Sequence, residues 1–152
     1  MLCSGAYGSV AIAAVGAIAN DGLMMKPRIV RQIVDGDNVM NAQPDALGRP
    51  VSAEVANIVT EIMIRAVTEE GGGIPLAQIP GYVIAGKTGT AQVAVLGQDV
   101  GDKKDHAWFV SFAPAYKPEI AVLALIENVG FGGSFAAPAV KGVYEPYVAN
   151  HP

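Results

Sequence analysis

The amino-acid sequence predicts an α+β fold, in which helices sandwich a mainly antiparallel sheet. The predicted elements run in the order helix, hairpin, helix, three strands, helix. The third of these strands, residues 120–126, is apolar without alternation, which is typical of a strand covered on both faces. The turn before it, residues 114–118, is short enough to join the last two strands as an antiparallel hairpin. With 152 residues, 51% of them hydrophobic and 16% charged, the chain has enough apolar residues for one domain with a core.

The first third of the chain predicts a packed helix followed by a surface hairpin. Residues 9–20 are rich in alanine and apolar on nearly every side, and the Asn-Asp-Gly at 20–22 supplies a stop. Residues 27–34 are rich in β-branched side chains, and the Asp-Gly-Asp-Asn sequence at 35–38 predicts a hairpin turn into a second strand. Residues 41–50 hold two prolines and a glycine, and we expect a loop there.

The clearest helix is expected over residues 53–70. Ser52 is placed to cap its first turn, Glu54 lies near the positive end of its dipole, and three glycines at 71–73 end it. Seven apolar residues recur at helical spacing and predict a single buried stripe. These residues are Val55, Ile58, Val59, Ile62, Met63, Ala66 and Val67.

Three strands and a final helix complete the predicted fold. The strands are expected over residues 82–95, 106–113 and 119–127. The final helix is amphipathic, with Pro138 near its first turn, and we expect Pro146 to break or kink it near its end.

Charge and composition exclude several classes of function. Ten Lys and Arg against fourteen Asp and Glu give a net charge of −4, and the basic residues are scattered, so we expect no nucleic-acid partner. One cysteine excludes an internal disulfide, two distant histidines offer no metal-ligand spacing, and we expect neither a metal nor a cofactor. The longest uncharged apolar run, residues 10–19, is about half of what a bilayer requires, and we expect neither a membrane span nor a targeting signal in this chain.

The motif that carries chemistry is Lys87-Thr88-Gly89-Thr90, on the first of the three predicted strands. A lysine beside two hydroxyls offers a cation and two donors to one anionic group, and Gly89 leaves room for another backbone to approach. On an edge strand, the unpaired backbone groups bind an extended peptide, and one N–H group can face a developing oxyanion. A match to the three residues Lys-Thr-Gly is weak evidence for a binding site, and the alternative is that these residues form a solvated turn.

The sequence around this motif resembles the third active-site motif of the penicillin-binding proteins, the serine D,D-transpeptidases that crosslink peptidoglycan. That family carries Ser-x-x-Lys, Ser-x-Asn and Lys-Thr-Gly motifs. Further segments of the chain are similar to the family in the family's order, and the resemblance covers roughly residues 9–149. The similar segments are residues 17–30, 81–92, 105–114 and 132–138.

The resemblance implies a role for each residue of the motif. Lys87 and Thr88 would bind the carboxylate of a peptidoglycan stem peptide or of a β-lactam. The backbone N–H of Thr90 would be one of two oxyanion donors, the Thr90 side chain would touch substrate, and Gly89 would keep the inner side of the strand open. The second donor in the family is the N–H of the nucleophilic serine.

The nucleophile is where this sequence departs from the family. None of its serines begins a Ser-x-x-Lys or a Ser-x-Asn sequence. The resemblance therefore implies that residues 1–152 are the C-terminal portion of a transpeptidase domain, with the missing N-terminal part as its partner. We expect this chain alone to be inactive in acyl transfer, and we expect its parent at the extracytoplasmic face of the bacterial cell membrane.

Two other interpretations remain open at this stage. A serine β-lactamase-like fragment would also contain Lys-Thr-Gly, although the flanking segments match the transpeptidases better. A non-catalytic fragment that binds peptides or acts as a scaffold is the alternative from a different class. A Ser-His-Asp triad is not expected, because Asp105 and His106 are adjacent on a strand and point to opposite faces. Phe131 is a candidate contact at the edge of the substrate groove.

Overall fold

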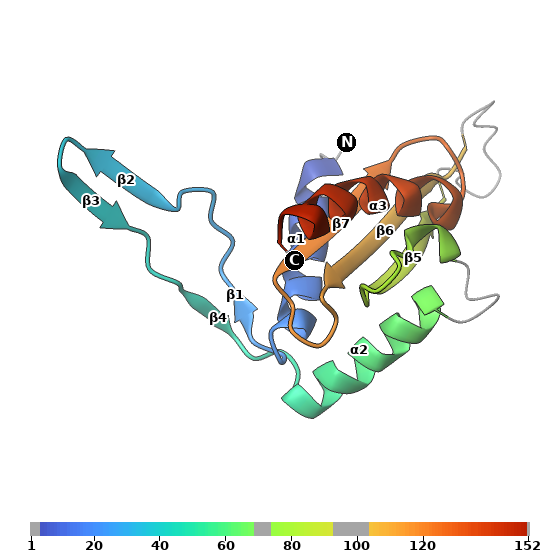
Figure 1. Cartoon of the computed structure of the whole chain (residues 1–152), viewed down its shortest axis with the longest axis horizontal. Coiled ribbons are helices and arrows are strands. Elements are labelled where there is room, and N and C mark those ends of the chain that lie inside the picture. The colour runs from blue at the N-terminus through green and yellow to red at the C-terminus, as the bar shows by residue number, and fades with distance from the viewer. Residues whose placement is uncertain (1–3, 69–73, 93–103, 152) are drawn as a thin grey trace.

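The computed structural model describes residues 4–68, 74–92 and 104–151. These residues form helices around one central sheet, with a long hairpin to one side (Figure 1). The helices are α1 (Ser4–Ala19), α2 (Ala53–Thr68), the short 3-10 helix η1 (Pro75–Ala77) and α3 (Gly132–Asn150). The strands are β1 (Met24–Met25), β2 (Gln32–Asp35), β3 (Asn38–Asn41), β4 (Ala46–Gly48), β5 (Ala85–Ala91), β6 (His106–Ala113) and β7 (Ile120–Ile126).

The central sheet has three antiparallel strands in the order β5-β6-β7. Helix α3 packs against all three strands, α1 packs against β6 and β7, and α2 packs against β5. Because side chains alternate along a strand, residues such as Phe109 point towards α3, and residues such as Phe112 point towards α1 and α2. Helices therefore lie on both faces of an antiparallel sheet, and the α+β prediction is confirmed.

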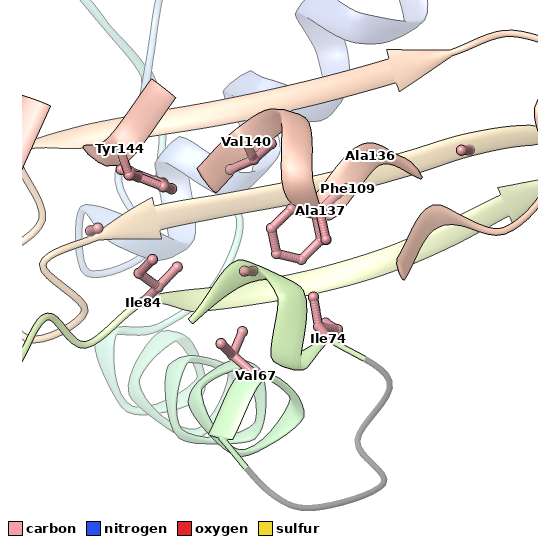
Figure 2. Packing of buried hydrophobic residues seen from close by; sticks show 11 residues of the cluster. Val67, Ile74, Ile84, Phe109, Ala136, Ala137, Val140 and Tyr144 are labelled. Atoms are coloured by element: carbon pink, nitrogen blue, oxygen red, sulfur yellow. The ribbon is translucent and has the colours of Figure 1, made fainter. Parts of the chain in front are cut away.

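The larger part of the core lies between the sheet and α3. Figure 2 shows Phe109 of β6 in the middle of this cluster, with Val140 and Tyr144 of α3 above it. Val67 of α2 and Ile74 close the cluster from the side of η1. The side chains of Phe109, Val140 and Tyr144 are completely buried, so α3 is fixed to the sheet along several turns.

A buried polar pair joins α3 to the sheet inside this apolar cluster. The Ser111 hydroxyl and the Tyr144 hydroxyl are 3.0 Å apart, and Ser111 also donates to the carbonyl of Val122 at 3.3 Å. Burial raises the pKa of Tyr144 to about 12, although its hydrogen bond with Ser111 opposes part of that effect. Both hydroxyls are thus satisfied where no water reaches them.

Helix α2 begins where the sequence predicts, but it buries a different face. The Val55 N–H donates to the Ser52 hydroxyl at 3.2 Å, so the predicted cap is present. The predicted apolar stripe is wrong in part, because Val55, Ile58 and Ile62 are exposed. The face that packs on the sheet is instead rotated around the helix by about one residue position from the predicted stripe. These buried residues are Ala56, Thr60, Met63, Ile64 and Val67.

The predicted boundaries agree closely with the structure for the last two strands and less well elsewhere. Strand β5 covers only Ala85–Ala91 of the strand expected at 82–95, and β2 covers Gln32–Asp35 where the β-branched run was residues 27–34. The strand expected at 106–113 is β6, and the strand expected at 119–127 is β7. Residues 93–95 of the strand expected at 82–95, and the glycines at 71–73, lie outside the described residues. Helix α1 begins at Ser4, earlier than expected.

Helix α3 differs from its prediction at both ends. It begins at Gly132, so Pro138 lies inside it, and it continues past Pro146 to Asn150. The helix does not break at Pro146, so that part of the prediction is wrong, and a kink there stays a prediction. A proline this close to a helix end removes a single hydrogen bond, and the last turn has other support. The Asn150 side chain donates to the carbonyl of Pro146 at 2.7 Å.

The chain between α1 and α2 forms a long arm. Strands β2 and β3 pair as the predicted hairpin, with Gly36 at a φ of 60° in its turn. The loop expected at 41–50 contains a short strand, β4, which pairs with β1 near the body of the molecule. Among the described residues, no helix is long and apolar enough to span a bilayer.

A candidate peptide-binding strand at the sheet edge

The Lys-Thr-Gly-Thr motif lies on β5, which is an edge strand of the central sheet. Its only strand neighbour in the described part of the chain is β6, where Lys87 lies opposite Val110 and Thr90 opposite Ala107. Two of the motif's residues, Lys87 and Thr90, are exposed. The long apolar β6 behind it makes this edge a rigid surface.

The motif's side chains divide between the two faces of the sheet. Lys87 and Gly89 lie on the face that α1 and α2 cover in part, whereas Thr88 and Thr90 lie on the α3 face. The two threonine hydroxyls therefore lie on the same side of the strand. No described residue is within hydrogen-bonding distance of either hydroxyl, so both can bind a ligand.

The Lys87 ammonium lies at the outer edge of β5. Its Nζ donates to the carbonyl of Thr88 at 3.0 Å, so this carbonyl points away from β6. Backbone groups alternate between inward and outward along an antiparallel strand, so the N–H of Thr90 also points outward. The ammonium has no carboxylate partner within the described ranges, and its charge is therefore available to an anion at the edge.

Close backbone contacts hold the motif strand in place. A Cβ at Gly86 would lie 2.5 Å from the tip of the Phe109 ring, so only glycine lets this ring fill the core beneath β5. A Cβ at Gly132, the first residue of α3, would lie 2.6 Å from the carbonyl oxygen of Gly89 and closer still to that of Trp108. The start of α3 therefore rests directly on the motif strand. The sequence alone did not reveal these packing roles.

Trp108 lies beside the motif on the Lys87 face. It is paired with Gly89 across the sheet, and its indole Nε1 is buried with no hydrogen-bond partner among the described residues. A buried donor without a partner is rare in a complete protein interior. On this face of the sheet, α1 packs against β6 and β7, and α2 packs against β5.

Phe131 lies directly before α3 and near the start of β6, and its side chain is 71% exposed. It lines an open cavity of about 500 Å³ whose other walls come from the loop before α3 and the residues before β6. The remaining lining residues are Lys104, Asp105, Val129, Gly130 and Phe135. A contact of Phe131 with substrate stays a prediction.

His106 has a structural contact. Its Nδ1 accepts a hydrogen bond from the backbone N–H of Asn128 at 3.0 Å, and the carbonyl of Asp105 accepts one from the N–H of Gly130 at 2.9 Å. Both contacts fix the loop before α3 to the start of β6. Within the residues that the structure describes, no cluster of His, Cys, Asp and Glu could hold a metal ion.

Within the described residues, this edge of the sheet thus presents a positive charge and several hydrogen-bonding groups. Lys87 supplies a positive charge, Thr88 and Thr90 supply hydroxyl donors, and the strand edge supplies backbone N–H and C=O groups. A peptide that ends in a carboxylate matches all of these groups.

Comparison with known proteins shows that the chain is similar to enzymes of peptidoglycan synthesis. The family model "Penicillin binding protein transpeptidase domain" matches residues 10–145. Peptidoglycan D,D-transpeptidase PbpA of Mycolicibacterium smegmatis is 38% identical over 130 residues, which are 80% of this chain and 25% of that protein. Stage V sporulation protein D of Bacillus subtilis is 32% identical over 139 residues, which are 87% of this chain and 21% of that protein.

Solved structures show the same fold. The ceftriaxone acyl-enzyme complex of penicillin-binding protein A from M. tuberculosis superimposes with a TM-score of 0.77 at 34% identity, over 88% of this chain and 30% of that one. Penicillin-binding protein 2X from Streptococcus thermophilus gives a TM-score of 0.78 at 27% identity, over 90% of this chain and 22% of that one. The chain spans about a quarter of the length of the curated relatives that it matches.

Proposed function

Because the chain belongs to the penicillin-binding protein transpeptidase domain family, we propose that it forms the carboxylate-binding part of a peptidoglycan D,D-transpeptidase. The observation that carries this proposal is the position of the Lys87-Thr90 motif on an edge strand, where no described residue pairs with its charge or its hydroxyls. The substrate is a peptidoglycan stem peptide, and β-lactams bind in its place. Related proteins support the second statement, since penicillin-binding protein A of M. tuberculosis forms acyl-enzymes with ceftriaxone and imipenem.

The terminal carboxylate of the peptide binds at the outer edge of β5. The Thr88 and Thr90 hydroxyls approach it from one face, and the Lys87 ammonium reaches it along the edge in place of its present contact with the Thr88 carbonyl. Hydrogen bonds to a charged group are stronger than neutral ones, so these three groups dominate the recognition of the chain end. Gly89 places no side chain between them.

Catalysis requires charge stabilisation at the carbonyl that is attacked. In the proposed reaction a serine hydroxyl attacks the penultimate D-Ala carbonyl, the terminal D-Ala leaves with a proton, and an acyl-enzyme remains. The outward N–H of Thr90 donates to the oxyanion that forms in this step. The serine and its lysine belong to a part of the transpeptidase domain that this sequence does not contain. We therefore propose that the chain is inactive alone and that the whole protein acts at the extracytoplasmic face of the cell membrane.

A chimera tests these roles directly. Residues 10–145 of this chain would replace the matching part of M. smegmatis PbpA, which would supply the remaining motifs. We expect fluorescent penicillin to label the chimera and to leave the isolated chain unlabelled. Each of Lys87→Ala and Thr88→Val should slow labelling by roughly 10- to 100-fold, because each removes a hydrogen bond to a charged group.

Lys117→Ala is the matched control, since Lys117 is an exposed lysine in the turn between β6 and β7. It should label at the rate of the unmodified chimera. A folded chimera whose Lys87→Ala variant reacts at that same rate would refute the assignment of the carboxylate site. Rapid hydrolysis of the penicillin in place of a lasting adduct would favour the β-lactamase-like alternative.

A further inference from the structure

The β2–β3 hairpin is an arm that extends away from the rest of the molecule (Figure 1). Every residue of both strands is exposed, and among the described elements neither strand contacts any helix or strand except the other. Apolar side chains lie on both faces of the arm. Ile33 and Met40 share one face, and Val34 and Val39 share the other; all four are more than half exposed. An isolated two-stranded ribbon is marginal in water, and exposed apolar surface of this kind marks an interaction site.

Side-chain contacts link the two sides of the arm near its base. Lys26 and Asp45 form an ion pair of 3.5 Å, and the Arg28 guanidinium donates to the carbonyl of Ala42 at 2.6 Å. The Arg49 guanidinium also donates to the carbonyl of Asp21. The first two contacts join the two sides of the arm, and the third joins its two ends between α1 and α2.

The hydrogen-bond pattern shows which backbone groups of β2 are free. The Ala42 N–H donates to the Arg31 carbonyl at 2.9 Å, so this pair extends the ladder beyond the ends of β2 and β3. Pairing alternates along an antiparallel ladder, so Arg31, Ile33 and Asp35 direct their backbone groups to β3. Gln32 and Val34 therefore direct their N–H and C=O groups outward.

These outward groups fit a second copy of the same strand. When residues 31–35 run antiparallel to themselves about a two-fold axis at Ile33, Gln32 lies opposite the partner's Val34. Gln32 and the partner's Val34 then exchange two backbone hydrogen bonds, and Val34 and the partner's Gln32 do the same. The same register places Arg31 opposite the partner's Asp35, and Asp35 opposite the partner's Arg31. Opposite charges directly across a sheet stabilise the pairing.

We propose that β2 is a self-association edge, along which two copies of the chain join their arms into one four-stranded antiparallel sheet. The charge pattern favours a second copy over an unrelated strand, because Arg31 and Asp35 complement each other only when the strand meets itself antiparallel. They do not meet within one copy, since four residues of extended strand separate them by about 13 Å. The edge of β3 carries no charged residue and has no such complementarity.

The paired strands run in opposite directions, so the two bodies lie at opposite ends of the new sheet. On one face, Ile33 contacts its equivalent on the axis, with Met40 beside it. The contact is small, so we expect a weak and reversible dimer, populated at protein concentrations of roughly 100 μM and above.

Charge reversal tests the register. Sedimentation equilibrium of the full chain should show that Arg31→Asp weakens dimerisation by roughly tenfold, since it places like charges opposite each other at two symmetric positions. Asp35→Arg should do the same, and the double variant R31D/D35R should restore the original association. Lys117→Asp, a reversal at an exposed site outside the arm, should leave association unchanged. Association that persists unchanged in both single variants would overturn the proposal, because another surface would then be responsible.

Disulfide trapping tests the two-fold axis independently. In a Cys3→Ser background, Ile33→Cys should oxidise rapidly to a dimer, because directly opposed residues of a non-hydrogen-bonded pair have Cα atoms about 4.5 Å apart, which suits a disulfide. Met40→Cys is the control on the same face. The axis passes through β2, so Met40 is roughly 14 Å from the partner's Met40 and should not crosslink. Equal crosslinking at both positions, or none at Ile33→Cys at millimolar protein, would refute the pairing.

Discussion

Gly132→Ala tests whether α3 must rest directly on the motif strand. A Cβ at this position would lie 2.6 Å from the carbonyl oxygen of Gly89, and both this atom and the nearby Trp108 carbonyl belong to the backbone of a paired sheet. Neither can move without disturbing the β5–β6 ladder. The helix must therefore lift away from the sheet at its first residue.

The cost of that movement follows from what α3 buries. Ala136, Ala137 and Val140 are completely buried against the sheet in the next turns of the helix, so a shift at Gly132 opens gaps beneath them. Overpacking of this kind costs about 1–3 kcal/mol, from which the better helix propensity of alanine subtracts less than about 1 kcal/mol. We expect a net loss of about 1–2 kcal/mol, or a Tm lower by roughly 2–8 °C.

Gly142→Ala is the matched control in the same helix. No atom lies within 4 Å of a Cβ built there, and the position is exposed, so the substitution should stabilise the protein by roughly 0.5–1 kcal/mol. Thermal and urea unfolding followed by circular dichroism would measure both variants. If Gly132→Ala proves as stabilising as Gly142→Ala, α3 does not depend on this contact and the account of the motif's support is wrong.

Three further predictions concern capping, the buried hydroxyls and pH. Ser52→Ala should cost about 1 kcal/mol of unfolding free energy because the Val55 N–H loses its cap, whereas Ser52→Asp should retain most of the stability. Ser111→Ala and Tyr144→Phe should each cost roughly 1–2 kcal/mol, and a double variant that costs the full sum would show that the two hydroxyls are not coupled. Between pH 10 and 12 the unfolded chain loses the Tyr144 proton while the folded chain keeps it, so stability should fall as pH rises through this window. Urea unfolding at several pH values would measure that fall, which should be smaller in Tyr144→Phe; an equal slope in both proteins would contradict the buried state of the phenol.

Local patterns were sufficient for the central strands. Residues 106–113 and 120–126 are apolar runs separated by a proline-containing turn, so their type and limits follow from the sequence and agree with β6 and β7. The same patterns did not fix the buried face of α2. Its seven periodic apolar residues span a wide arc, and contact with β5 selects the part of that arc that includes Ala56 and Met63, leaving Ile58 exposed.

The candidate site, too, was predicted from the sequence in some respects and required the structure in others. The Lys-Thr-Gly-Thr motif and its place on a strand were evident from the sequence, and so was the lack of a Ser-x-x-Lys motif. That Lys87 and Thr88 lie on opposite faces follows from the strand itself. That the Lys87 ammonium nevertheless reaches the outer edge of β5 required the structure, since its contact with the Thr88 carbonyl shows where the side chain turns.

By itself, then, the sequence determined the elements, the family resemblance and the residue types at the site, because each depends on neighbours within one strand or one helical turn. The tertiary structure decided which edge of the sheet is open, which helix face is buried, and why Gly132 has no room for a side chain. Gly132 contacts Gly89 across 132 − 89 = 43 residues of chain. Contacts over such a separation are set by how whole elements pack, and no local pattern of residues encodes them.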